Sequence, residues 1–512
     1  METESQPNYK FIEDPIFDIT QHSIGINQDV INKSCNKYVG SNCSNSAGLN
    51  GSRSTITITG DQISKMQLQN FALEMQILIA TAGTPFTKAV NVAPSWNLPF
   101  HCIRSINVKF NDSYTFSIPS DYAYVATANL LQYPKEYVNN LDHMLFTPCF
   151  DEDNDKYISS LIAVEKAVTN HASSSFIKRL NKYVNGYDGS ETAANFSSHL
   201  HPYRKIIPFN HLLFNIGNTV INNLSKIQID IDWESTSNII LERVTQNVGL
   251  TDEDASGNVY VTSCAIITDN LNMSPTQLTQ ELKQKRLFKS DNIAFLKPSI
   301  YVKDMSSDKT EVINNVKNLS HVVIMQFSAN GSNTFDNGST TAANVRTYTS
   351  CGQTFLLSNS GYYATPETST LPSVTDAALG LPDFRYARNF ISGFQMQYGN
   401  SLYPNHTLTI TDGSSRSHFD SSELYYEYMK CYDYIGGGGT PFISKNIFDK
   451  VFPFICIKPF SGSSPFQTSP SSDLIIRMNG GGSSGKYAII VYTLETLKVN
   501  ADKSITPFGV PN

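Results

Sequence analysis

The sequence predicts an all-β protein with short helical insertions. Runs of strand length in which apolar and polar residues alternate recur along most of the chain, and they favour half-buried strands. Aromatic residues make up 11% and charged residues only 16% of the sequence, against roughly 25% charged residues in ordinary soluble domains. Low charge combined with many Ser, Thr, Asn and aromatic residues suits a β protein that covers much of its surface with partners.

The chain is too long for a single core. At 512 residues it exceeds the size at which one hydrophobic core usually stops growing, which predicts two or three domains. The net charge of −7 gives no general basic surface for nucleic acid, so no sequence-specific nucleic-acid binding is expected. The start METESQPNYK lacks the pattern of a signal peptide, and no run reaches 18 apolar residues, so we expect a soluble protein without a transmembrane segment, made in the cytosol.

The first half of the chain begins as an arm and continues as strands. Residues 1–50 are too polar to build a core and are expected to form an N-terminal arm. Strand patterns follow, including a hairpin with its turn at Asn111-Asp112. In KIQIDIDW, Ile227, Ile229 and Ile231 alternate with Gln228, Asp230 and Asp232. This alternation predicts one buried face and one face in water. Between residues 120 and 182 the apolar spacing lengthens to three and four, which predicts short helices.

A single amphipathic helix is expected to divide the chain. Ser274-Pro275 is a helix-start signal, and Leu278, Leu282 and Leu287 supply one apolar face. The expected organisation is an N-terminal arm at 1–50, a first β-sandwich at 51–273, a linker helix at 274–290, a second β-sandwich at 291–505 and a C-terminal tail at 506–512. Irregular strand spacing with long polar loops favours jelly-roll sandwiches over an up-and-down barrel or a propeller.

The stretch from Phe394 to Tyr426 shows the strand pattern of the second half most plainly. Phe394, Met396 and Tyr398 share one face, and a turn is expected at Gly399-Asn400. Pro404 then removes a donor from the ladder, which indicates an edge strand or a strand start. The remainder is predicted to be an exposed loop without catalytic groups.

The order of these features resembles the double jelly-roll major capsid proteins of icosahedral DNA viruses, and in particular those of virophages and polinton-like viruses. Four stretches carry the resemblance: NLPFHCIRSINVKFND at 97–112, KIQIDIDW together with the later segment SPTQLTQELKQKRLF, QYGNSLYP at 397–404, and YAIIVYTLETLKVNADKSI at 487–505. The resemblance spans about residues 50 to 505, and it lies in the order and spacing of the stretches.

The resemblance implies a structural protein of the virion that is not an enzyme. It implies two tandem eight-stranded jelly rolls standing side by side, with three chains forming a homotrimeric, pseudo-hexameric capsomer. Such capsomers tile an icosahedral shell around double-stranded DNA, in contact with neighbouring capsomers and with penton, minor capsid or cement proteins. Long loops are then expected to form outer towers, and the N-terminal arm to become ordered on assembly.

Several motifs imitate functional sites, but each lacks a necessary part. GGGSSGK, from Gly480 to Lys486, matches a phosphate loop but has Tyr487 where a hydroxyl for magnesium belongs, and a strand pattern follows it; a flexible hairpin loop is favoured. The acidic run from Asp151 to Asp155 lacks the glycine and glutamate of a calcium loop.

The histidines and cysteines also lack the spacing of a known site. His199 and His201 lack a metal-ligand spacing. Ser414, Ser415, His418 and Asp420 lack the nucleophile elbow of a hydrolase. The eight cysteines are scattered and are expected to be free thiols. No catalytic, cofactor-binding or metal-binding residue is therefore predicted.

A second class of function stays open at this stage. Aromatic-rich segments that contain Tyr362-Tyr363, Tyr425-Tyr426, Tyr432 and Tyr434 motivate a carbohydrate-binding β-sandwich or a fibre-like attachment protein as the alternative.

Overall fold

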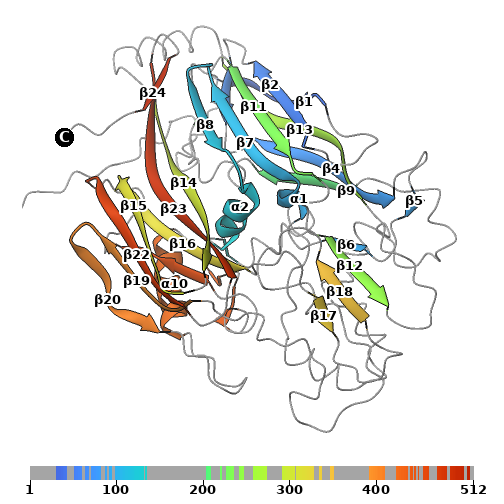
Figure 1. Cartoon of the computed structure of the whole chain (residues 1–512). Helices are drawn as coiled ribbons and strands as arrows, with labels where there is room; N and C mark the ends of the chain where they lie inside the picture. Colours follow the sequence, from blue (N-terminus) through green and yellow to red (C-terminus); the bar gives the residue numbers. More distant parts are fainter. Residues whose placement is uncertain are drawn as a thin grey trace, which may run out of the picture.

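Strands dominate the computed structural model of the chain (Figure 1). The residues that it describes are 30–42, 51–59, 64–67, 71–81, 87–88, 92–94, 98–131, 133–134, 203–208, 220–221, 226–235, 241–246, 258–273, 291–305, 307–327, 334–336, 346–350, 391–409, 422–435, 439–441, 443–445, 448, 454–459, 470–480, 485–500 and 504–507.

Eight strands of the first half form the two sheets of a sandwich. In chain order they are β1 (Val30–Val39), β2 (Arg53–Thr59), β4 (Ala72–Thr81), β7 (Ile103–Phe110), β8 (Tyr114–Ile118), β9 (Tyr203–Pro208), β11 (Lys226–Trp233) and β13 (Asn258–Met273). One sheet has the neighbours β1-β13-β4-β9, and the other has the neighbours β2-β11-β7-β8. All of these pairs are antiparallel.

Eight strands of the second half repeat the arrangement. In chain order they are β14 (Asp291–Met305), β15 (Lys309–Val316), β16 (Leu319–Phe327), β19 (Ile391–Tyr398), β20 (Ser401–Thr409), β21 (Phe454–Ile457), β22 (Ser472–Gly480) and β23 (Gly485–Val499). One sheet runs β14-β23-β16-β21, and the other runs β15-β22-β19-β20.

The two halves have the same strand order. When the eight strands of each half are counted along the chain, one sheet holds the first, eighth, third and sixth, and the other holds the second, seventh, fourth and fifth. Two four-stranded antiparallel sheets in this order form a jelly roll. The predicted fold class, two tandem jelly rolls with short helical insertions, is therefore confirmed.

Short elements extend this framework. They are β3 (Ser64–Gln67), β5 (Thr87–Lys88) and β10 (Val220–Ile221) in the first sheet, β24 (Ile505–Pro507) beside β23, and the helices α1 (Leu98–His101), α2 (Tyr122–Leu130) and α10 (Ser422–Tyr434). A further small sheet, in the order β17-β18-β12-β6, contains β6 (Val92–Pro94), β12 (Leu241–Gln246), β17 (Thr334–Asp336) and β18 (Arg346–Ser350).

The alternating sequence explains why the central strands form. In β11 the isoleucines Ile227, Ile229 and Ile231 are fully buried, and Ile229 lies in register with Ile56 of β2 and Val108 of β7. Branched side chains in adjacent strands pack well on a pleated surface. Trp233 ends the row, where its buried indole N–H donates to the Ser54 hydroxyl at 2.7 Å, so the polar atom of a buried aromatic side chain is satisfied.

The predicted N-terminal arm contains a strand of the first sandwich. Residues 30–39 form β1, which pairs with β13 from Val30 to Val39. The sequence KSCNKYV is too polar to suggest a core strand, and among the described strands β1 pairs with β13 alone, at the edge of the sheet. Residues Leu98–His101, which precede the predicted strand β7, form a short helix. The predicted linker helix at 274–290 lies outside the described residues.

Two expectations for the second half are confirmed and two are corrected. Phe394, Met396 and Tyr398 are buried on one face of β19, and Pro404 lies in the edge strand β20. The end of the predicted loop, Ser422 to Tyr426, instead begins helix α10. The segment after Gly480 is not a hairpin loop, because it connects β22 in one sheet with β23 in the other.

Candidate assembly surfaces and the interface between the halves

Several connections leave from one end of the two rolls. In an antiparallel sandwich, connections after odd-numbered strands leave from one end and those after even-numbered strands from the other. The connections at 119–202, 328–390 and 410–453 all follow odd-numbered strands, whereas the turns at 111–113 and 399–400 follow even-numbered ones. The four strands of the small sheet β17-β18-β12-β6 also lie in connections that follow odd-numbered strands. This sheet joins strands of both halves.

The two halves contact each other through the fifth strand of the first roll. Tyr114 of β8 donates its hydroxyl proton to Glu495 Oε1 of β23 at 2.6 Å. Glu495 also pairs with Lys297 of β14 at 3.0 Å. Burial, together with the hydrogen bond to the carboxylate, raises the pKa of Tyr114. The tyrosine is therefore held as a neutral donor at this contact.

Apolar and backbone contacts surround this polar one. The rings of Phe116 and Phe295 meet edge to face with centroids 5.6 Å apart, an arrangement that aromatic pairs prefer. Phe116 is 2% exposed and Phe295 is 3% exposed. The backbone N–H of Ile505 donates to the Ser113 hydroxyl at 2.9 Å. In Figure 1, β8 faces β14, β23 and β24 along this contact.

The helices meet at the end that carries the long connections. Both α2 and α10 follow the fifth strand of their roll, so they are equivalent elements. The Tyr428 hydroxyl of α10 donates to the carbonyl of Leu131 at the end of α2, at 2.8 Å. Just beyond each helix, Pro134 and Pro441 form a β-bridge. Equivalent parts of the two rolls are thus in direct contact.

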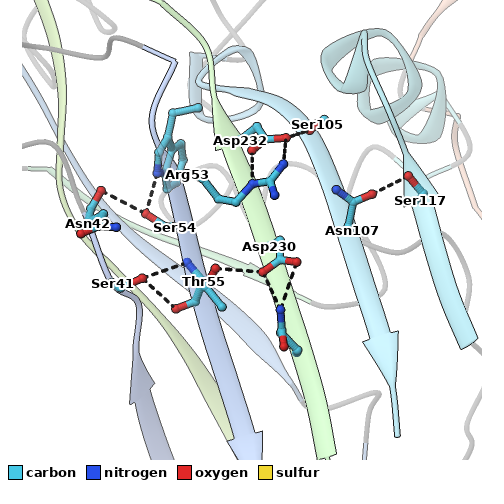
Figure 2. Close-up of polar contacts among 12 residues, drawn as sticks. Ser41, Asn42, Arg53, Ser54, Thr55, Ser105, Asn107, Ser117, Asp230 and Asp232 are labelled. Carbon is cyan, nitrogen blue, oxygen red and sulfur yellow. Dashed lines mark hydrogen bonds and ion pairs between the residues drawn. The ribbon is translucent and has the colours of Figure 1, made fainter. Parts of the chain in front are cut away.

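The outer face of the first roll carries a polar network (Figure 2). Arg53 of β2 donates to both oxygens of Asp232, at 2.6 and 3.1 Å, and Ser105 of β7 donates to the same carboxylate. Two residues earlier on the same face of β11, Asp230 accepts a hydrogen bond from the Thr55 hydroxyl at 2.9 Å and pairs with Lys109 at 3.5 Å. Each carboxylate is therefore paired with a cation and hydrogen-bonded to a hydroxyl.

This network corrects the expectation that the aspartates of β11 face water. Asp230 is 4% exposed and Asp232 is 8% exposed. Arg53 of β2 lies in register with Asp232, and Thr55 of β2 and Asn107 of β7 lie in register with Asp230. Neighbours on both sides of β11 therefore cover the carboxylates. The hydrogen bond from Arg53 lowers the pKa of Asp232, against the effect of burial. The face is polar, and its carboxylates are shielded from water by the side chains with which they form ion pairs.

Replacing Asp232 by alanine is expected to destabilise the first roll. The change leaves Arg53 and Ser105 without their shared acceptor, and loss of a buried hydrogen-bonding partner costs about 1–3 kcal/mol. Thermal unfolding at neutral pH measures the shift in midpoint.

A matched control is Asp112→Asn, because asparagine tolerates the positive φ of 57° at this position. Asp112 pairs with Lys226 at 2.9 Å, but its side chain is 58% exposed, and exposed pairs contribute about 0–1 kcal/mol. Equal shifts for the two variants would show that the network on β11 contributes no more than a surface ion pair.

Most of the sequence motifs that imitate sites lie outside the described residues. These are the acidic run 151–155, His199, His201, Ser414, Ser415, His418 and Asp420. Gly480 ends β22, and the element that begins at Gly485 is the predicted strand rather than a helix. Across the described ranges no group of three or more His, Cys, Asp or Glu side chains could hold a metal ion.

The described cysteines carry free thiols. They are Cys35, which is exposed, and Cys102, Cys264, Cys431 and Cys456, which are buried. Among the same residues, no helix is both long enough and apolar enough to cross a membrane.

The tyrosines that motivated carbohydrate binding have a different structural role. Tyr425, Tyr426, Tyr432 and Tyr434 belong to helix α10 and not to a loop. Tyr432 and Tyr434 are buried, and Tyr425 packs against Tyr428 and Phe448. Only Tyr426 of these four is largely exposed, at 63%. Most of this aromatic surface therefore forms core, and Tyr362-Tyr363 lies outside the described residues.

Comparisons with known proteins find similarity in structure and none in sequence. No protein-family model matches the sequence, and no curated protein matches it. Several solved structures are similar to the chain. A chain from the cryo-EM structure of the Sputnik virophage is similar at a TM-score of 0.48 and 12% identity, over 98% of this chain and 93% of that one.

Two other solved structures are similar along nearly their whole length. The Faustovirus major capsid protein has a TM-score of 0.46 and 9% identity, over 91% of this chain and 90% of that one. The mavirus major capsid protein has a TM-score of 0.43 and 10% identity, over 93% and 90%. The TM-scores and the sequence identities are low, so the fold assignment rests on the strand order of the chain itself.

Proposed function

We propose that this chain is a structural major capsid protein whose trimers tile an icosahedral shell around double-stranded DNA. The observation that carries the proposal is the repeated strand order: one chain contains two jelly rolls of identical topology. Three such chains contain six equivalent rolls. A ring of six supplies the near-hexagonal outline that tiles a shell, and closed symmetry lets one set of contacts be reused.

The contact between the rolls supports this role. The interface is built from a paired carboxylate, packed aromatic rings and a shared small sheet, so each chain presents its two rolls as one block. The end with the long connections is proposed to face outward, where added chain length does not interfere with tiling. The partners are then further copies of this chain, neighbouring capsomers and penton or cement proteins, and the location is the virion.

The mass of the purified chain in solution tests the proposal. Light scattering after size-exclusion chromatography is expected to give three times the 56.8 kDa of one chain, and electron microscopy of concentrated samples is expected to show shells or sheets of hexagonal tiles. A chain that stays monomeric at every concentration, and forms neither trimers nor shells, would contradict the capsid role.

A further inference from the structure

Helix α10 lies lengthwise along strand β21. The rings of Tyr428 and Phe454 meet edge to face, with their centroids 4.8 Å apart. Further along both elements, the Lys458 ammonium lies over the Tyr434 ring, 4.4 Å from its centroid. Because both residue numbers rise from the first contact to the second, the helix and the strand run in the same direction.

Two cysteines lie between these two contacts. Cys431 follows Tyr428 by one helical turn, and Cys456 follows Phe454 by two residues of strand. Residues three apart on a helix share a face, as do residues two apart on a strand. Both thiols therefore point into the same seam between helix and strand, where Cys431 is 0% exposed and Cys456 is 2% exposed.

The two thiols are in contact. The side chains of Cys431 and Cys456 are hydrogen-bonded to each other, and this bond, together with burial, raises the pKa of Cys456. Burial raises the pKa of Tyr428, and the two thiols add to that effect, so both sulfurs also lie close to the Tyr428 hydroxyl. Side chains in such contact need little movement to reach the Cβ separation of about 3.5–4.5 Å that a disulfide requires.

We propose that Cys431 and Cys456 form an oxidation site, at which hydrogen peroxide produces a disulfide between helix α10 and strand β21. One sulfur attacks the peroxide: an S–O bond forms, the O–O bond breaks, and water leaves with the thiol proton. The second sulfur then displaces the hydroxyl group of this sulfenic acid as a second water, and the S–S bond forms. Two electrons and two protons pass from the thiols to the peroxide.

Burial determines which oxidant reaches the site. The thiolate is the reactive form of cysteine, and the raised pKa keeps Cys456 protonated at neutral pH. The reaction is therefore slow, and a small uncharged oxidant such as hydrogen peroxide is favoured over oxidised glutathione, which is large and charged. The exposed thiol of Cys35 is expected to react earlier.

The disulfide fixes a helix that connects several parts of the chain. Glu427 of α10 accepts from the Tyr403 hydroxyl of β20 at 2.7 Å, and Tyr428 donates to the carbonyl of Leu131 in the first roll at 2.8 Å. A covalent link from the same helix to β21 therefore joins both sheets of the second roll and stabilises its contact with the first.

The benefit of such a link rests on the proposed capsid function, whereas its chemistry does not. A shell protein that is released from a cell passes from a reducing into an oxidising environment. A disulfide that forms after assembly stabilises the released shell, and it is absent while the chains fold and assemble.

Peptide mapping of the oxidised full-length chain tests the proposal. The wild type is treated with hydrogen peroxide, unfolded, alkylated at its remaining free thiols and digested without reduction. Mass spectrometry is expected to find the peptides of Cys431 and Cys456 joined, at the sum of their masses less two hydrogens. A reducing agent added after oxidation is expected to release both peptides.

Thermal unfolding measures the effect on stability. Oxidation is expected to raise the unfolding midpoint of the second roll by about 5–10 °C, because the bond restricts the unfolded chain. Cys431→Ala and Cys456→Ala are each expected to abolish this rise. Cys102→Ala is the matched control, because it also removes a buried thiol but in the first roll, and it is expected to keep the full rise.

The map of the wild type decides the outcome even where a variant does not fold. Recovery of Cys431 and Cys456 as free thiols, after a treatment that has oxidised Cys35, would overturn the proposal. Either cysteine joined to a different partner, or oxidised to the sulfinic acid without a disulfide, would overturn it as well. A monomeric chain that forms the disulfide removes the capsid role and keeps this inference, and trimers whose two thiols stay free do the reverse.

Discussion

Phe116→Ala is expected to uncouple the two jelly rolls while leaving each of them folded. The Phe116 ring is buried against Phe295 of the other roll, and removing a buried phenylalanine ring costs about 3–5 kcal/mol. Phe116 also lies in register with the buried Val108 of β7, so part of the loss falls on the first roll and part on the docking of the two rolls. Calorimetry is expected to show one cooperative transition for the wild type and two separated transitions for the variant.

The matched control is Phe394→Ala. Phe394 is fully buried in the second roll, so the variant loses the same ring within one sandwich. Its transition is expected to move to a lower temperature without the appearance of a second one. If Phe116→Ala also kept a single transition, the contact between β8 and β14 would not be what holds the rolls together.

Acidification from pH 7 to pH 5 is expected to destabilise the chain by about 4 kcal/mol through two buried histidines, about 2 kcal/mol each. Burial lowers the pKa of His101 to about 3 and the pKa of His321 to about 3. The unfolded chain therefore takes up these protons near pH 6.5 and the folded chain does not. Their stabilising effect is complete above that pH and is lost as the pH falls from 6.5 towards 3.

His321→Phe is the variant that isolates one of these groups. The His321 ring is stacked on Tyr492 with centroids 4.3 Å apart, so a phenyl ring can take its place. The variant is expected to lose about half of the change in stability between pH 7 and pH 5, measured by denaturant unfolding. The carboxylates of Glu74 and Asp232 stay ionised in this window. Burial raises the pKa of Glu74, but its two cations together outweigh burial, and the hydrogen bond from Arg53 does the same for Asp232, so the pKa of each lies below its ordinary value.

His406→Phe serves as the control for exposed histidines. Its side chain is 64% exposed and lies 3.3 Å from Glu423. This variant is expected to retain the full pH dependence. An unchanged pH dependence in His321→Phe would mean that the buried ring does not cause the effect.

The sequence predicts the strands whose two faces differ strongly in polarity. β2, β11 and β19 alternate clearly, and their apolar residues are buried where expected. β1 and β15 are missed, because they are edge strands with few inward apolar residues and many exposed polar ones. Alternation is weak in such strands.

Helix α10 could have been found from the sequence. Leu424, Tyr428, Cys431 and Tyr432 recur at the spacing of one helix face and are all buried. The many tyrosines of this segment instead suggested an exposed aromatic loop. A helix whose buried face consists largely of aromatic rings has the same composition as a binding loop, and only the spacing of the rings distinguishes the two.

The interface residues could not be predicted from the sequence. Tyr114 and Glu495 are 381 residues apart in the chain, and their contact depends on how the two sandwiches dock. The burial of Asp230 and Asp232 depends on which strands flank β11, and alternation along a single strand does not reveal its neighbours.

A low-resolution electron-microscopy map of the purified chain tests the central claim most directly. Threefold particles with six upright rolls, two from each chain, and with the long connections at 119–202 and 328–390 leaving from the same end, are the predicted result. Monomers, or twofold dimers in which the two rolls of a chain do not stand side by side, would contradict the account.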